Sequence, residues 1–158
     1  METADGPWTV IQNRQDGQVD FYRKWADYKN GFGDKNGNFW LGILEAIHQL
    51  TQKPSVLRIE LTSWLGDSAY AQYSTFSIAD ESKNYRLSKS GFSENTSDAM
   101  AYHNGSPFST YDKENNANAC ASRSSGAWWY KNCFWSNGVH SKDENGGMIW
   151  CVFYSVPG

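Results

Sequence analysis

The sequence predicts a single domain of 158 residues in which short helices and strands are followed by a long, loop-rich segment. Up to about residue 90, apolar residues recur at the spacings typical of helices and strands. From about Gly91 to Gly147, Gly, Ser, Asn and Asp dominate and neither spacing persists. Within this segment Cys120 and Cys133 enclose the aromatic run Gly126–Tyr130, which indicates an ordered loop closed by a disulfide.

The first elements are a strand and two helices. Trp8–Gln12 alternates and carries β-branched residues, so we expect a strand there. Asp20 is expected to cap a short helix that has three aromatic residues on one face and that ends at Gly31. A second helix is expected to begin near Asn38 and to reach Leu50, because its apolar residues follow helical spacing.

Strands dominate the next part of the chain. Apolar and polar residues alternate over Leu57–Leu61, which predicts a half-buried strand. The turn Gly66–Ser68 then leads into a second strand at Ala69–Phe76, and Tyr85–Leu87 is a weaker candidate for a third. The apolar run Met148–Val156 is expected to return to the core as a further strand.

Two of the three cysteines indicate that the loop-rich segment is ordered. A structureless stretch of this length normally argues against a compact domain. A disulfide between Cys120 and Cys133 would remove about 3 kcal/mol of chain freedom from the unfolded state, which favours an ordered lobe and an extracellular protein. The third cysteine, Cys151, is then either a buried thiol or the partner of a cysteine absent from this sequence.

Aromatic residues make up 16 % of the chain, and many of them stand beside Gly, Ser and Asn. Such rings suit either a loop-rich core or the wall of a sugar-binding site. Asn95–Ser97 and Asn104–Ser106 match the acceptor pattern for N-glycosylation, which agrees with secretion.

Composition also excludes several classes of function. The net charge is −3 without a basic cluster, which argues against nucleic-acid binding and against a polybasic membrane patch. No apolar stretch approaches the roughly 20 residues of a membrane span. A thiol nucleophile at Cys151 would need a catalytic signature around it, and its apolar neighbours would raise the pKa of the thiol. We therefore do not expect an enzyme.

A series of motifs runs in order through the chain. They are Trp8–Gln12, Gln15–Gly17, Val19–Arg23, Tyr28–Gly33, Phe39–Gly42, Leu57–Leu61, Ala69–Tyr73, Tyr85–Leu87, Tyr102–Gly105, Pro107–Thr110 and Gly126–Cys133. Together they resemble the fibrinogen C-terminal domain, which occurs in fibrinogen chains, ficolins, tachylectins, angiopoietins and tenascins. The resemblance covers residues 1 to about 137.

The resemblance implies an α+β fold with a central twisted antiparallel sheet, flanking short helices and a loop-rich binding lobe. Residues 1 to about 90 would form the sheet and helix lobe, residues 91–147 the calcium and ligand lobe, and residues 148–158 the returning strand. The family's N-terminal lobe precedes the start of this sequence, so we expect it to be largely absent. The family's final core strand is either supplied by the last apolar run or missing.

The resemblance also places a calcium loop at Asp112, Glu114 and Asn116. Calcium takes six to eight oxygen ligands and favours carboxylates. Because Asn116 stands where an aspartate is usual and the loop to Cys120 is about two residues shorter than in ficolins, calcium binding would be weak or lost. The alternatives are a weak calcium site and a solvated polar turn.

In sugar-binding members of the family, an acetyl group lies against the disulfide, an aromatic residue, a histidine and a later Tyr–Ala pair. In this chain the pocket would instead be lined by residues in and after the disulfide loop. They are Ser124, Asn132, Cys133, Phe134, Trp135, Glu144 and Asn145.

The resemblance implies a cis peptide bond between Asn132 and Cys133 that directs a backbone N–H at the ligand. Phe134 replaces the histidine, so binding of acetylated sugars in the family manner is weakened. The remaining alternatives are a shifted aromatic site at Trp128, Trp135 or Phe134, and simple packing of these rings.

Two functions follow from the resemblance. The first is a secreted, lectin-like pattern-recognition module of innate defence that binds glycans or acetylated ligands, with glycans, glycoproteins or microbial surfaces as partners. The second is a protein-interaction module like the angiopoietin and tenascin members, with a lost sugar pocket. Oligomers would form through flanking regions outside this sequence.

Overall fold

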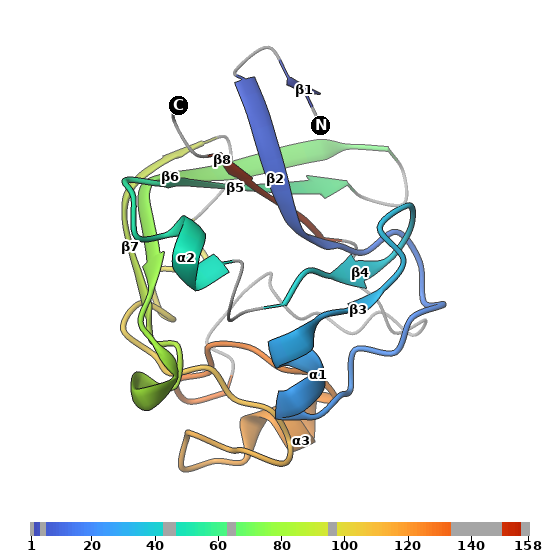
Figure 1. Cartoon of the computed structure of the whole chain (residues 1–158), viewed down its shortest axis with the longest axis vertical. Helices are drawn as coiled ribbons and strands as arrows, with labels where there is room; N and C mark the ends of the chain where they lie inside the picture. Colours follow the sequence, from blue (N-terminus) through green and yellow to red (C-terminus); the bar gives the residue numbers. More distant parts are fainter. Residues whose placement is uncertain are drawn as a thin grey trace.

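The computed structural model of the chain describes residues 2–3, 6–42, 47–62, 66–94, 98–133 and 150–155. Among them a sheet forms the upper layer in Figure 1, and the segment of residues 98–133 lies beneath it with the short helices. No helix in these ranges is long and apolar enough to cross a membrane. The α+β architecture expected from the sequence is confirmed.

The sheet is antiparallel throughout the described pairings, in the order β3-β4-β2-β8-β5-β6-β7, with β1 paired to β2. The strands on the N-terminal side are β1 (Glu2–Thr3), β2 (Gly6–Asn13), β3 (Phe32–Gly33) and β4 (Phe39–Trp40). The others are β5 (Val56–Thr62), β6 (Ser68–Ile78), β7 (Leu87–Glu94) and β8 (Trp150–Ser155). The helices are α1 (Trp25–Asn30), α2 (His48–Leu50), the 3₁₀ helix η2 (Glu81–Lys83) and α3 (Cys120–Ser124).

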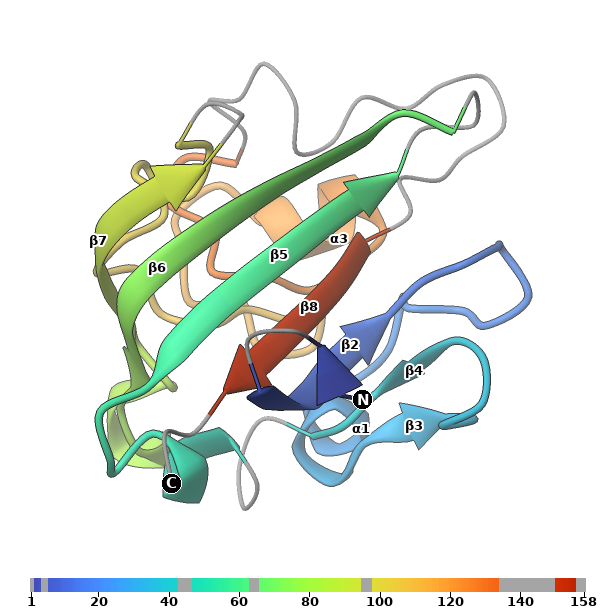
Figure 2. The ribbon, with the colours of Figure 1, turned by 90° about the horizontal axis from the view of Figure 1, so that it is seen from above.

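The strands predicted at Trp8–Gln12, Leu57–Leu61, Ala69–Phe76 and within Met148–Val156 are confirmed. Of the weaker candidate Tyr85–Leu87, only Leu87 lies in a strand, as the first residue of β7. In β5, Leu57 and Ile59 are buried, while Arg58 lies on the other face, where its Nε atom is 2.8 Å from Glu60 Oε1. This alternation is the two-residue period of a half-buried strand. The last apolar run supplies β8, which pairs with β2 on one side and β5 on the other and so lies inside the sheet (Figure 2). The alternative that the final strand is missing is therefore excluded.

The first predicted helix is only partly correct. It ends at Gly31, whose backbone has φ 87° and whose N–H donates to Asp27 O at 2.8 Å. It begins at Trp25 rather than after Asp20. The Asp20 carboxylate instead accepts the Tyr22 N–H at 2.8 Å, which is a local turn.

The second predicted helix is wrong at its start. Phe39 and Trp40 form β4, which pairs with both β2 and β3, and the helical turn is confined to His48–Leu50. Buried Asn38 stabilises the chain just before β4, because its Oδ1 atom accepts the Gln15 N–H at 2.6 Å. Pairing with distant strands thus overrides the helical spacing. Residues 43–46 lie outside the described part of the chain.

The core between the sheet and the 98–133 segment is aromatic, with Phe108 at its centre. Phe108 is fully buried, and its ring centroid lies 5.0 Å from that of Trp129, 5.4 Å from that of Tyr28 and 6.0 Å from that of Trp40. Edge-to-face and offset contacts at these distances stabilise aromatic cores. Many of the rings that stand in loop-like sequence are therefore packing residues.

Candidate recognition site

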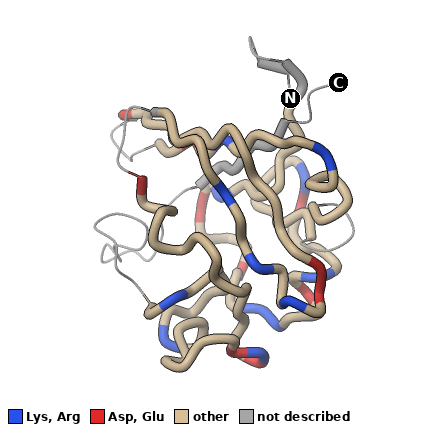
Figure 3. Tube along the Cα trace, turned by 90° about the vertical axis from the view of Figure 1, so that its left-hand side faces the viewer, with Lys and Arg blue, Asp and Glu red and all other residues tan. Residues whose placement is uncertain are grey.

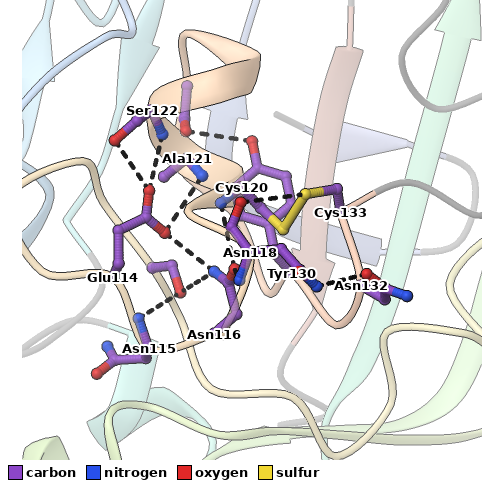
Figure 4. Close-up of a disulfide and its surroundings, with 12 residues drawn as sticks. Glu114, Asn115, Asn116, Asn118, Cys120, Ala121, Ser122, Tyr130, Asn132 and Cys133 are labelled. Carbon is purple, nitrogen blue, oxygen red and sulfur yellow. Dashed lines mark hydrogen bonds between the residues drawn. A yellow bond between two sulfur atoms is a disulfide. The ribbon is translucent and has the colours of Figure 1, made fainter.

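The predicted disulfide between Cys120 and Cys133 is present, with a Cα–Cα distance of 4.8 Å and a sequence separation of 13 (Figure 4). Cys120 is fully buried at the first position of α3, whereas Cys133 is half-buried. The bond therefore connects the core to a more exposed part of the lobe and closes a loop over residues 120–133.

The backbone of this loop turns sharply at both ends of its helix. Ala119 before α3 has φ 49° and Ser125 after it has φ 51°, which are left-handed conformations rare for residues other than glycine. Cys133 shares this conformation, with φ 49°. Such residues persist only where the surrounding structure holds them, so the closed loop has a specified shape.

The aromatic run inside the loop packs inward. Trp128, Trp129 and Tyr130 are all buried. The Trp129 indole N–H donates to Tyr85 O at 2.7 Å, and buried His103 places its Nδ1 atom 3.0 Å from Trp129 O. Trp128 is thus a packing residue and offers no ring face to a sugar. Phe134 and Trp135 lie outside the described part of the chain.

The exposed rim beside the disulfide is made by two asparagines. Asn118 and Asn132 are both exposed, and Asn118 Nδ2 donates to Asn132 Oδ1 at 2.5 Å (Figure 4). The Asn132 Nδ2 atom has no hydrogen bond in the described structure. Of the other predicted pocket residues, Ser124 ends α3, whereas Glu144 and Asn145 lie outside the described residues.

The three residues predicted as calcium ligands point to different partners. Asp112 Oδ1 accepts the Trp25 backbone N–H at 2.9 Å and the Thr110 hydroxyl at 2.8 Å. The Glu114 carboxylate reaches the first turn of α3, and Asn116 Oδ1 accepts the Cys120 N–H at 3.2 Å.

The charges of the described part are mixed. Segments of Lys and Arg and segments of Asp and Glu are interspersed along the described trace in Figure 3. Of the basic residues near the loop, Lys131 places its Nζ atom 5.3 Å from the Tyr102 ring.

The family model for the C-terminal globular domain of fibrinogen beta and gamma chains matches residues 1–156. The chain belongs to the fibrinogen C-terminal domain family. Members of this family are non-enzymatic recognition and interaction modules.

Sequence and structure relatives agree with the assignment. Angiopoietin-related protein 7 of Mus musculus is 45% identical over 157 residues, which are 92% of this chain and 46% of that protein. Ficolin-3 of Homo sapiens is 44% identical over 141 residues, with coverages of 87% and 47%. The fibrinogen-like globe domain of human ANGPTL2 superposes with a TM-score of 0.86 at 31% identity, covering 97% of this chain and 82% of that chain. The chain spans about half the length of the curated relatives.

One expectation drawn from the fibrinogen C-terminal family is wrong for this chain. No cis peptide bond occurs among the described residues, so the bond between Asn132 and Cys133 is trans. The left-handed backbone of Cys133 turns the chain at this point instead.

The placements of Glu114 and Asn116 do not fit the family's calcium site. Their carboxylate and amide oxygens already accept N–H groups in and before α3, and Asn116 turns its NH₂ group toward Glu114. In the described ranges no group of three or more His, Cys, Asp and Glu side chains could hold a metal ion. Calcium binding stays a prediction from the resemblance, and the described contacts do not support it.

Sequence reasoning missed two features of the candidate site. Asn118 was not singled out, although it lies beside Asn132 at the rim. Glu114 was interpreted as a metal ligand rather than as an anchor of α3. The run Asn115, Asn116 and Asn118 was the available signal, since asparagines bond locally to backbone groups.

Proposed function

We propose that this chain is an extracellular, lectin-like recognition module of innate defence that binds glycans or other acetylated ligands on glycoproteins or microbial surfaces. The observation that carries the proposal is the exposed Asn118–Asn132 pair beside the disulfide. The similarity to ficolin-3 supports a binding role of this kind.

The chemistry of the rim suits an acetamido group, which has one carbonyl acceptor and one N–H donor. Asn132 keeps free amide N–H donors, and its oxygen is held by Asn118. The disulfide and the buried aromatic run limit the movement of this rim, so little freedom is lost on binding.

A protein-interaction module is the second candidate. The similarity to angiopoietin-related protein 7 favours it, as does the burial of Trp128, which removes one flat ring that a sugar could use. In this case the same exposed rim would contact a protein partner.

A surface-binding assay separates the two candidates. The chain is passed over immobilised N-acetylglucosamine, with glucose at the same density as the control. We expect binding to the acetylated sugar and a loss of about tenfold or more in N132A, since one hydrogen bond is removed. N36A is the matched control, because Asn36 is an exposed asparagine far from the loop in sequence. Silence on a broad array of glycans, together with capture of a receptor protein, would favour the second candidate.

A further inference from the structure

The Glu114 carboxylate lies where the family resemblance places a calcium ligand, yet its contacts serve another purpose. We infer that Glu114 stabilises this lobe in place of a calcium ion. It ties the loop of residues 112–118 to the disulfide-closed loop, so that the lobe keeps its shape without a divalent cation.

Both oxygens of Glu114 bind the start of α3 (Figure 4). Oε1 accepts the Ser122 N–H at 2.8 Å and the Ser122 hydroxyl at 3.0 Å, while Oε2 accepts the Ala121 N–H at 3.3 Å. The first N–H groups of a helix have no partner within the helix, and a carboxylate satisfies them with strong, charge-assisted bonds. Glu114 therefore fixes the segment that begins at Cys120.

Asn116 completes the connection. Its Oδ1 atom accepts the N–H groups of Asn118 and Cys120 at 3.1 and 3.2 Å, and its Nδ2 atom donates to Glu114 Oε2 at 3.0 Å and to Ser109 Oγ at 3.1 Å. The Asn116 amide thus connects the Glu114 carboxylate to the backbone of Cys120, which forms the disulfide, and to the backbone of the rim residue Asn118.

A calcium ion would have to break this network. To bind there, the ion would require Glu114 to give up its hydrogen bonds to α3 and Asn116 to turn its side-chain oxygen outward. Of these two residues, only Glu114 would then provide a carboxylate ligand. Asp112 is also engaged, through Trp25 and Thr110. Because calcium requires six to eight oxygens, the exchange is unfavourable.

Thermal unfolding of wild type and E114Q, in EDTA and in millimolar CaCl₂, tests the inference. We expect the Tm of wild type to be the same in both buffers and that of E114Q to be lower by about 4–8 °C in both, because the amide cannot accept all of these bonds. E60Q is the control: it removes an exposed carboxylate paired with Arg58, and its Tm should change little.

Two results would overturn the inference. One is a wild-type Tm that rises in CaCl₂, with the rise lost in E114Q. The other is an E114Q Tm equal to that of E60Q in EDTA. Neither readout uses a sugar or a protein partner, so the result is separate from that of the proposed function.

A different observation concerns Asn104, where the geometry points to N-linked glycosylation. Asn104 is exposed, and its Oδ1 atom accepts the Lys89 N–H at 2.9 Å. Its Nδ2 atom, the one that carries the glycan, has no hydrogen bond in the described structure. A glycan on this atom is therefore compatible with the contacts of the folded chain. This site rests on the proposed extracellular location.

The chemistry requires a lipid-pyrophosphate-linked oligosaccharide and the transferase of the secretory pathway. Nδ2 of Asn104 forms a bond to the anomeric carbon, the bond from that carbon to the pyrophosphate breaks, and the amide proton is lost. Ser106, the third residue of the acceptor pattern, is 4% exposed, so transfer must precede the folding of this turn.

The chain is expressed with a secretory leader in a eukaryotic cell, and the folded product is deglycosylated enzymatically in ¹⁸O-labelled water. We expect Asn104 to appear as labelled aspartate in peptide mass spectra, and N104Q to lose the mass of one glycan. Unlabelled Asn104 in the secreted protein would overturn the assignment. Residues 95–97, the other acceptor pattern, lie outside the described structure and are scored separately. Binding to N-acetylglucosamine is measured on the same sample, so that the glycosylation of Asn104 and the proposed binding function are tested separately.

Discussion

The Lys89 ammonium lies 2.7 Å from Asp98 Oδ2, and this ion pair joins β7 to the beginning of the 98–133 segment. The Lys89 side chain is only 5% exposed and that of Asp98 is 24% exposed. The Tyr73 hydroxyl donates to Asp98 Oδ1 at 2.8 Å, and its ring centroid lies 4.3 Å from Lys89 Nζ. The sheet and the 98–133 segment are therefore joined by a charge pair whose ammonium is buried and whose carboxylate is partly exposed.

Removing the carboxylate should be costly. In D98N the buried ammonium loses its counter-charge, and we expect the free energy of unfolding to fall by about 3 kcal/mol. K89M should cost less, because Asp98 keeps the Tyr73 bond and some contact with water. Urea unfolding measures both values, with E60Q as the surface control. A D98N value no larger than that of E60Q would contradict a structural role for the pair.

His103 should make the domain sensitive to mild acid. Burial lowers the pKa of His103, and Lys131 lowers it further, whereas the bond to Trp129 O acts in the opposite direction. The unfolded chain therefore binds the proton more readily than the folded chain. Stability is full above about pH 6.5 and decreases as the pH falls from there toward the lower pKa of the folded state.

Urea unfolding between about pH 7.5 and pH 5 checks this prediction, with a maximum slope of about 1.4 kcal/mol per pH unit. H103Q should flatten the pH dependence while lowering stability at neutral pH, because it loses a buried ring. H48N is the control for the loss of a histidine elsewhere, since His48 is only partly buried. An unchanged slope in H103Q would show that another group is responsible.

Gly91 should tolerate no side chain. It has φ 68°, and a Cβ atom there would overlap the Ser74 side chain on β6. G91A is therefore expected to destabilise the domain by about 1–3 kcal/mol, from backbone strain and the clash together. G17A is the matched control, because a Cβ at Gly17 meets nothing within 4 Å. Equal melting temperatures of G91A and G17A would contradict the close approach of Gly91 to the Ser74 side chain.

Strands β2, β5, β6 and β8 could be predicted because their pattern is local, whereas most of β7 extends beyond the predicted residues. The alternation of Leu57 and Ile59 with Arg58 reports burial directly, and the apolar run of β8 reports a strand that lies inside the sheet. The helix expected from Asn38 failed because Phe39 and Trp40 pair with strands distant in sequence. Nothing local in the sequence encodes that pairing.

The candidate site was predictable only in part. The cysteine spacing and the aromatic run indicated the closed loop, which the structure contains. The short helix α3 was not predicted, because five residues show no helical period. The role of Glu114 was missed for the same reason: without α3, its N–H donors at Ala121 and Ser122 are unknown.

Reduction of the disulfide should loosen the recognition rim. In C120S/C133S the unfolded chain regains the freedom of the closed loop, and we expect a loss of about 3 kcal/mol in the free energy of unfolding. Binding to N-acetylglucosamine is measured at a temperature at which the variant is still folded. We expect the variant to bind more weakly than wild type under this condition, so that unfolding does not account for the loss. Binding equal to that of wild type would place the ligand site elsewhere.

The most direct measurement is a nuclear magnetic resonance titration of the ¹⁵N-labelled chain with N-acetylglucosamine. We expect the side-chain amide signals of Asn118 and Asn132 and the backbone signal of Cys133 to shift most, and glucose to leave them unchanged. Shifts confined to other parts of the sheet, or none at saturating sugar, would contradict the claim that this disulfide-closed loop is the recognition surface.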